Sequence, residues 1–216
     1  MKILKLIIIL SFSLNAFSQG YMGHKVTLRY NNLFFPQVYN LLDNYEATDF
    51  SIRSIHSFSL GYVLGQSTEL FVTYDKSNLD YISTIDETYV SYGYVYDQEK
   101  EVPVRISSIS YGFGMRFYNR DFMAPLGFYT QLGLLISIAE ARATNKENKG
   151  KLTDSFMYPR INWGIGLQRV IIGNLMYDIG LHSALSLFNP FKENLPQSRL
   201  FATNLLSLKI GLTYVL

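Results

Sequence analysis

The sequence of 216 residues predicts an all-β protein, an eight-stranded antiparallel up-and-down transmembrane β-barrel. Two observations predict this fold. First, apolar residues alternate with small or polar residues in eight segments, and this period of two places them on opposite faces of a strand. Second, Gly, Ser and charged residues share one face while Leu, Ile and aromatic residues share the other, which is the pattern expected when the apolar face meets lipid.

The N-terminus is typical of a secretory signal. Lys2 and Lys5 precede an apolar run, 6–14, and Ala16-Phe17-Ser18 provides small residues at alternate positions for signal peptidase. We therefore expect residues 1–18 to be a cleaved signal peptide and residues 19–216 to form one outer-membrane β-barrel domain. The alternative is a membrane anchor, but the apolar run is shorter than the roughly 20 residues of a spanning helix.

Charge and cysteine content narrow the function classes. The chain has 19 Lys and Arg against 17 Asp and Glu, and no Cys. Removal of Lys2 and Lys5 with the signal leaves the mature charge balanced, and the remaining basic residues are scattered, so we expect no nucleic-acid partner. Without disulfides an exported protein depends on packing and backbone pairing for its stability.

Eight strands are predicted, an even number, as single-chain bacterial barrels require. Their ranges are 21–30, 51–64, 68–76, 104–118, 125–139, 160–171, 175–188 and 205–216. The connections alternate between short turns, at 65–67, 119–121 and 172–174, and long segments, at 31–50, 77–103, 140–158 and 189–203. This asymmetry is typical of periplasmic turns and outward loops, so both termini are expected on the periplasmic side.

The predicted inward face is rich in charge. A soluble antiparallel barrel would place its apolar residues inside instead. Since eight strands enclose a bore just wide enough for side chains, we expect no water-filled pore, and buried charges need partners. We interpret them as a structural ion-pair network; a proton or ion path is the alternative. The predicted lumen polar network is Lys25, Arg29, Arg53, Glu69, Asp75, Arg116, Asp178, His182 and Lys209.

Aromatic residues are abundant, with 17 Tyr, 15 Phe and one Trp. Amphipathic rings are favoured where hydrocarbon meets headgroups, which predicts an aromatic girdle, although some rings would merely fill space. The members predicted for the periplasmic rim are Tyr62, Phe117, Phe128, Tyr177 and Tyr214, and those for the outer rim are Tyr30, Tyr74 and Trp163.

The signal, the eight amphipathic strands, the four long loops and the terminal strand ending at 209–216 together resemble the OmpA/OmpX-like family of small outer-membrane barrels. The chain is also similar to the outer-membrane β-barrel domain proteins of Bacteroidota, the group that includes PorT-like proteins, and its signal ending at 16–19 is similar to theirs. Many such barrels end in an aromatic residue, whereas this one ends in Leu216, with Tyr214 two positions before it. The resemblance implies a bacterial outer-membrane location, contact with membrane lipid and lipopolysaccharide, and insertion by the barrel assembly machinery.

The sequence has three histidines as candidates for catalysis or metal binding, His24, His56 and His182. Outer-membrane lipid A deacylases use a His-x-Ser pair, which occurs at none of these positions, and a nucleophile must lie beside its base. The histidines fall on separate predicted strands without a local ligand cluster. We therefore expect no enzyme activity, no metal and no cofactor.

The long connections are the expected places of contact. Segment 77–103 interleaves acidic residues with tyrosines, which fits a cationic or carbohydrate partner or simply a solvated tip, and its run 88–96 is suited to extend a hairpin above the membrane. Segment 140–158 carries Arg142, Lys146, Lys149 and Lys151, which suit lipopolysaccharide phosphates.

The predicted function is a structural or surface-interaction role, in which loops contact a surface ligand or an envelope protein. The alternatives are an accessory component of protein secretion or envelope assembly, as the PorT-like resemblance implies, and a lipid A-modifying enzyme. Replacing His56 and His182 with Ala distinguishes the enzyme, because only an enzyme predicts altered lipid A acylation. Loss of secreted cargo after deletion distinguishes the accessory role.

Overall fold

The computed structural model describes residues 23–38, 50–91, 94–119, 123–143, 153–187 and 204–216. The predicted signal peptide, 1–18, and the predicted connection 189–203 lie outside these residues. None of the described segments forms a helix long and apolar enough to cross a membrane.

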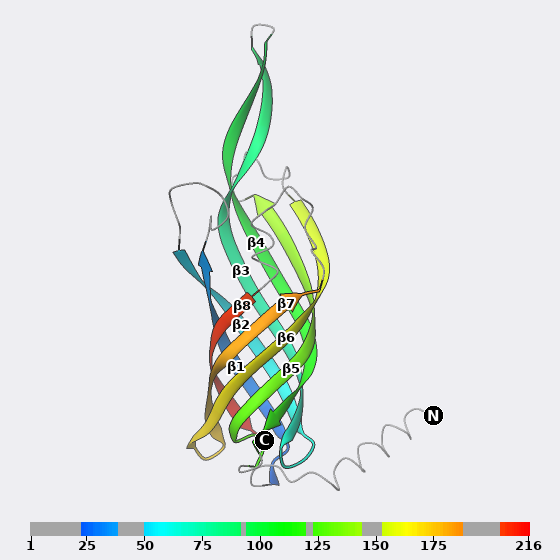
Figure 1. Ribbon diagram of the computed structural model, residues 1–216, viewed down its shortest axis with the longest axis vertical. Helices are drawn as coiled ribbons and strands as arrows, with labels where there is room; N and C mark the ends of the chain where they lie inside the picture. The colour runs from blue at the N-terminus through cyan, green and yellow to red at the C-terminus, as the bar shows by residue number, and fades with distance from the viewer. Residues whose placement is uncertain (1–22, 39–49, 92–93, 120–122, 144–152, 188–203) are drawn as a thin grey trace, which may run out of the picture.

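Eight antiparallel strands close into one barrel, each pairing with its neighbours in sequence, and β1 pairs with β8 (Figure 1). The strands are β1 Val26–Val38, β2 Phe50–Val63, β3 Thr68–Ser91, β4 Tyr94–Tyr118, β5 Gly127–Ala143, β6 Thr153–Ile172, β7 Leu175–Ser186 and β8 Asn204–Val215. The predicted all-β, eight-stranded, antiparallel barrel is confirmed.

The largest difference from the predicted ranges is at β3 and β4. Of the predicted connection 77–103, residues 77–91 and 94–103 instead continue the two strands, which pair from Thr68↔Phe117 to Ser91↔Tyr94. The predicted extension of a hairpin over 88–96 agrees with this register. The error arose because Pro103 and the acidic residues are loop signals in a sequence, whereas a two-stranded ribbon with both faces in water accommodates polar residues on either face.

Strand β1 also extends further than predicted. Segment 31–50 was expected to be a connection, but β1 continues to Val38 and β2 begins at Phe50. Asn31 is buried on the inner face and pairs with Ser57. Consecutive asparagines are a loop signal in a sequence, but the polar interior of the barrel also accommodates an asparagine side chain within a strand.

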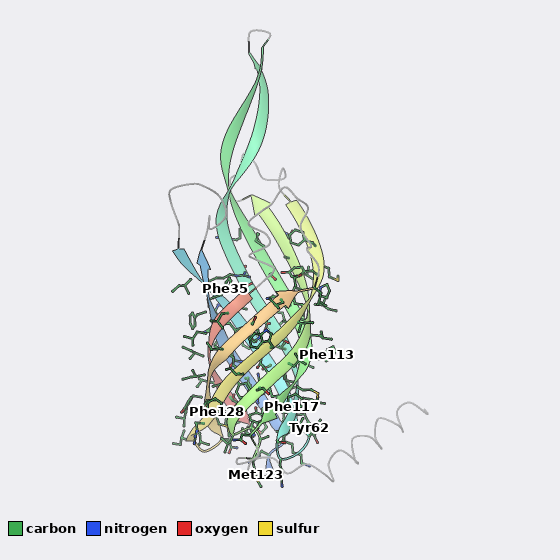
Figure 2. The ribbon with its side chains drawn as sticks, viewed as in Figure 1. Phe35, Tyr62, Phe113, Phe117, Met123 and Phe128 are labelled. Carbon is green, nitrogen blue, oxygen red and sulfur yellow. The ribbon has the colours of Figure 1, made fainter. Side chains whose placement is uncertain are left out.

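The barrel wall has an apolar outer face and a polar inner face. Large hydrophobic side chains on the outside are exposed, among them Phe113, Phe117 and Phe128 (Figure 2). At the end that carries the short turns the interior closes with a small apolar cluster of Val63, Tyr118, Ala124 and Tyr129. Above this cluster the interior is filled mainly by polar and charged side chains.

Candidate functional site: the charged interior

The carboxylate of Glu69, one residue after the start of β3, is the centre of one buried cluster. It accepts hydrogen bonds from Arg29 Nη2 at 2.6 Å, from the Tyr118 hydroxyl at 2.8 Å and from the Thr27 hydroxyl. Arg116 Nη1 lies 3.8 Å from the same carboxylate. Because the side chain of Glu69 is fully buried, this number of donors is what keeps a charged carboxylate compatible with the interior.

Space for this cluster comes from Gly61 on β2. A Cβ atom at this position would overlap the Glu69 carboxylate and the Thr27 hydroxyl, and would lie 2.8 Å from Arg29 Nη1. The predicted alternation of glycine with larger residues on the inner face thus has a direct packing role here.

A second cluster is centred on Asp178, near the start of β7. Lys209 Nζ lies 2.8 Å from Asp178 Oδ2, and the Tyr129 hydroxyl donates to Asp178 Oδ1 at 2.6 Å. Lys209 also donates to the Tyr129 hydroxyl. Asp178 is fully buried and Lys209 is 3% exposed, so this is a desolvated ion pair with a shared tyrosine.

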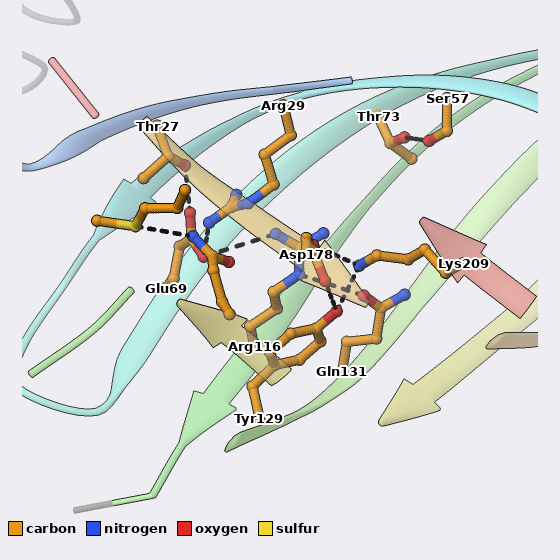
Figure 3. A network of polar contacts seen from close by, with 12 residues as sticks. Thr27, Arg29, Ser57, Glu69, Thr73, Arg116, Tyr129, Gln131, Asp178 and Lys209 are labelled. Carbon is orange, nitrogen blue, oxygen red and sulfur yellow. Dashed lines mark hydrogen bonds and ion pairs between the residues drawn. The ribbon is translucent and has the colours of Figure 1, made fainter. Parts of the chain in front are cut away.

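Arg116 on β4 joins the two clusters (Figure 3). Its guanidinium lies 5.4 Å from the ring centre of Tyr129 and 4.8 Å from that of Phe71, and its Nε donates to Gln131 at 3.2 Å. The rings of Tyr118 and Tyr129 are also in contact, with centroids 5.5 Å apart. The lower lumen is therefore one connected network rather than separate pairs.

The interior nearer the hairpin end contains more hydroxyl contacts. Thr73 donates to Asp75 at 3.0 Å, Ser110 and Ser137 are hydrogen-bonded, and Arg53 donates to Ser77. A polar cavity of about 20 Å³ lies between these groups and the lower network. That volume holds about one water molecule.

The structure places eight of the nine predicted lumen residues inside the barrel. Arg29, Arg53, Glu69, Asp75, Arg116, Asp178, His182 and Lys209 are all buried. Lys25 differs, because it precedes β1 and is half-buried. The predicted strand began at residue 21, so the alternation was extended too far toward the N-terminus.

Several interior residues were missed from the sequence. Arg160 is buried on the inner face, as its even spacing from Asn162 would have indicated. Tyr118, Tyr129 and Thr27 each donate a hydrogen bond to a buried carboxylate. Tyrosine has an apolar ring and a polar hydroxyl, so its position in the alternation does not reveal that it will complete a charged cluster.

The predicted girdle residues lie at different heights. Tyr62, Phe117, Phe128, Tyr177 and Tyr214 are near the short-turn ends of their strands, and Figure 2 shows the first three there. Tyr30 and Tyr74 occupy one outward row, since each pairs with Phe58. Trp163 is exposed near the middle of β6, because β6 begins at Thr153 and not at Arg160, and its place at the outer rim stays a prediction.

The three histidines lie in different segments of the fold. His56 on β2 is exposed, whereas His182 on β7 is buried and His24 precedes β1. Within the described ranges no group of three or more His, Cys, Asp or Glu side chains is arranged to hold a metal ion. The interior chemistry on view is charge pairing and hydrogen bonding.

No protein-family model and no curated protein sequence matches the chain. Among solved structures, the barrel is similar to Ail, the attachment invasion locus protein of Yersinia pestis, in complex with the heparin analogue sucrose octasulfate. The TM-score is 0.51 at 9% identity, over 89% of this chain and 98% of that one. The N-terminal β-barrel domain of Pseudomonas aeruginosa OprF has a TM-score of 0.40 at 11% identity, over 88% of this chain and 97% of that one. Neisserial surface protein A has a TM-score of 0.44 at 12% identity, again over 88% and 97%. The fold of this chain is that of the small outer-membrane barrels.

Proposed function

We propose that the protein is an integral protein of the bacterial outer membrane, with residues 1–18 removed on export and both ends of the 19–216 barrel domain in the periplasm. The observation that carries this proposal is the distribution of side chains across the barrel wall: large apolar side chains are exposed outside and charged side chains are buried inside. A water-soluble barrel has the reverse arrangement. The short turns at one end and the long hairpin at the other support the orientation.

The lumen is a sealed support rather than a channel. Eight strands leave room only for side chains, and here Arg116, Tyr129 and the Glu69 cluster occupy the bore. The aromatic residues near the short-turn end, including Phe117, Phe128 and Tyr214, serve as the periplasmic girdle, and Tyr30 and Tyr74 contribute to the outer one.

The β3–β4 hairpin is the surface-contact element. Beyond the pair Tyr81↔Val104, its strands pair only with each other in the described part of the chain, over ten pairs ending at Ser91↔Tyr94. At about 3.4 Å per residue this ribbon extends roughly 30 Å past the wall, and Figure 1 shows it projecting from the barrel. A hairpin of this length has two open edges and is available to a partner.

Charge indicates the kind of ligand. Residues 82–103 contain five acidic residues and one lysine. The register places four of the acids at positions of one face, with Asp86 opposite Glu99, Asp97 opposite Thr88 and Glu101 opposite Thr84. Such a face favours a cationic partner. An acidic face repels a polysulfated ligand such as the one in the Ail complex.

Two experiments test the membrane assignment. Expressed in a Gram-negative host, the protein should sediment with outer membranes and migrate differently in gels with and without boiling; recovery in soluble periplasm would overturn the proposal. In planar bilayers the folded protein should give no stepwise conductance, and a steady ohmic channel would contradict the sealed lumen.

A third experiment tests the hairpin. Purified protein in detergent should bind poly-lysine in a salt-dependent manner and bind sucrose octasulfate no better than a boiled control. A variant in which Asp86, Asp97, Glu99 and Glu101 are replaced with Asn or Gln should lose the poly-lysine binding. Equal binding by this variant would show that the hairpin acids are not the contact.

A further inference from the structure

Three polar side chains interrupt the apolar outer face on β1, β2 and β3. Asn32 pairs with His56, and His56 pairs with Lys76, so the three form one outward row across adjacent strands. His56 and Lys76 are exposed. Lys76 has no hydrogen bond or ion pair to any described residue, and the row itself contains no acidic side chain. A cation on a wall that faces lipid needs a polar partner outside the protein.

The next outward row, toward the short turns, is aromatic. Tyr30, Phe58, Tyr74 and Tyr111 pair in sequence across β1 to β4. Their rings form two contacts, Tyr30 with Phe58 at 4.8 Å and Tyr74 with Tyr111 at 5.4 Å between centroids. The Tyr30 hydroxyl lies 2.8 Å from His56 Nδ1, which fixes the imidazole above the rings and leaves its Nε2 without a bond to the described residues.

An apolar groove of about 760 Å³ crosses the wall at this aromatic row. It is lined mainly by outward side chains of β1 to β4, β7 and β8, including Leu28, Tyr30, Leu60, Val72, Tyr74 and Leu212. A hydrocarbon chain is the occupant such a lining favours, because the groove presents almost no polar surface. The polar row therefore lies directly beside a groove that is suited to an acyl chain.

We propose that this row and groove form a binding site for one phosphorylated glycolipid of the outer leaflet. Lys76 contacts a phosphate as a point charge, His56 Nε2 and Asn32 contribute hydrogen bonds, and an acyl chain lies in the groove. The site rests on the proposed membrane location and orientation. The proposal is more specific than a general affinity for lipid, because the headgroup binds at the row of Asn32, His56 and Lys76 and the acyl chain binds in the adjacent groove.

The charge of Lys76 is tested by native mass spectrometry of protein released from nanodiscs of phosphatidylcholine containing bis-phosphorylated lipid A. Wild-type protein should retain one lipid A, and Lys76→Gln should retain about five-fold less, the effect of losing one cation near a charged headgroup. The matched control is Arg169→Gln, which removes another exposed cation from the outer face near the short-turn end of β6; retention should be unchanged. Dephosphorylated lipid A should not be retained.

The groove is tested by filling it. Val72→Phe adds bulk inside the groove and should lower lipid A retention, whereas Leu134→Phe adds bulk to a similarly exposed outward position on β5 and should not. Retention by Lys76→Gln equal to wild type, or equal retention of the dephosphorylated lipid, would overturn the site while leaving the proposed function intact. Failure of wild-type protein to insert into nanodiscs would overturn both.

Discussion

Strands β3 and β4 belong both to the wall around the lower lumen and to the projecting hairpin, but the two regions are stabilised in opposite ways. In the wall, β3 pairs with β2 on one side and β4 on the other, and its Glu69 side chain is buried among three hydrogen-bond donors and the guanidinium of Arg116. Beyond Tyr81, β3 pairs only with β4 in the described residues, and the register sets Asp86 opposite Glu99. Like charges directly opposite each other are destabilising.

The contrast indicates that the lower lumen stabilises the barrel, whereas the β3–β4 hairpin contributes little to its stability. A two-stranded ribbon is only marginally stable in water by itself, whereas a closed sheet satisfies every strand edge. We therefore expect substitutions in the lower lumen to destabilise the whole barrel and changes in the hairpin to leave it folded.

Glu69→Gln should have the largest effect. It removes the charge that faces Arg29 and Arg116, both of which stay buried. Loss of one partner from a buried ionic cluster costs about 3–5 kcal/mol of unfolding free energy. Urea unfolding in detergent, followed by fluorescence and by heat-modifiable gel mobility, measures this.

The matched control for that substitution is Glu140→Gln. Glu140 forms an ion pair with Arg142 whose side chains are 36% and 67% exposed, and such pairs contribute at most about 1 kcal/mol. Equal losses for the two variants would mean that the Glu69 cluster does not stabilise the barrel.

Lys209→Met should destabilise the barrel by about 2–3 kcal/mol, because Asp178 stays buried but keeps its hydrogen bond from Tyr129. Combined with Asp178→Asn in a double-mutant cycle, the pair should show a coupling energy of about 1–3 kcal/mol. Purely additive losses would contradict the ion pair seen in the structure.

Gly61→Ala should reduce the unfolding free energy by about 1–3 kcal/mol, since the new methyl group meets the Glu69 carboxylate and Arg29. Gly65→Ala serves as the comparison, because no atom lies within 4 Å of a Cβ there. Its effect should stay within about 0.5 kcal/mol. If both substitutions are equally tolerated, the cluster has more room than its geometry indicates.

Replacing residues 84–101 with Asn-Gly should have the smallest effect. The new turn would join Ser83 and Val102, which already pair, and Asn-Gly suits a two-residue hairpin turn. The unfolding free energy should change by less than about 1 kcal/mol, because the removed pairs contact no other strand of the described barrel. A shortened variant that fails to fold would show that the ribbon is part of the folding unit.

The sequence predicted some parts of the site far better than others. Alternation alone placed Arg29, Glu69 and Lys209 inside, because a strand leaves only two directions for a side chain. It did not predict that Glu69 would meet Arg29 rather than Arg53, since partner choice depends on register and shear between strands. The sequence also did not predict that β6 begins at Thr153, because Pro159 and the charges before it resemble a loop.

Local periodicity and turn signals were sufficient to predict the number of strands, their antiparallel order and which residues lie on the outer face of the barrel. The sequence did not predict how far β3 and β4 continue past the wall, or which residues form the Glu69 and Asp178 clusters. It also did not predict that Asn32, His56 and Lys76 lie in one row beside an apolar groove. The physical reason is that side-chain direction is a property of one strand, whereas contact between strands depends on a register that closure of the barrel sets.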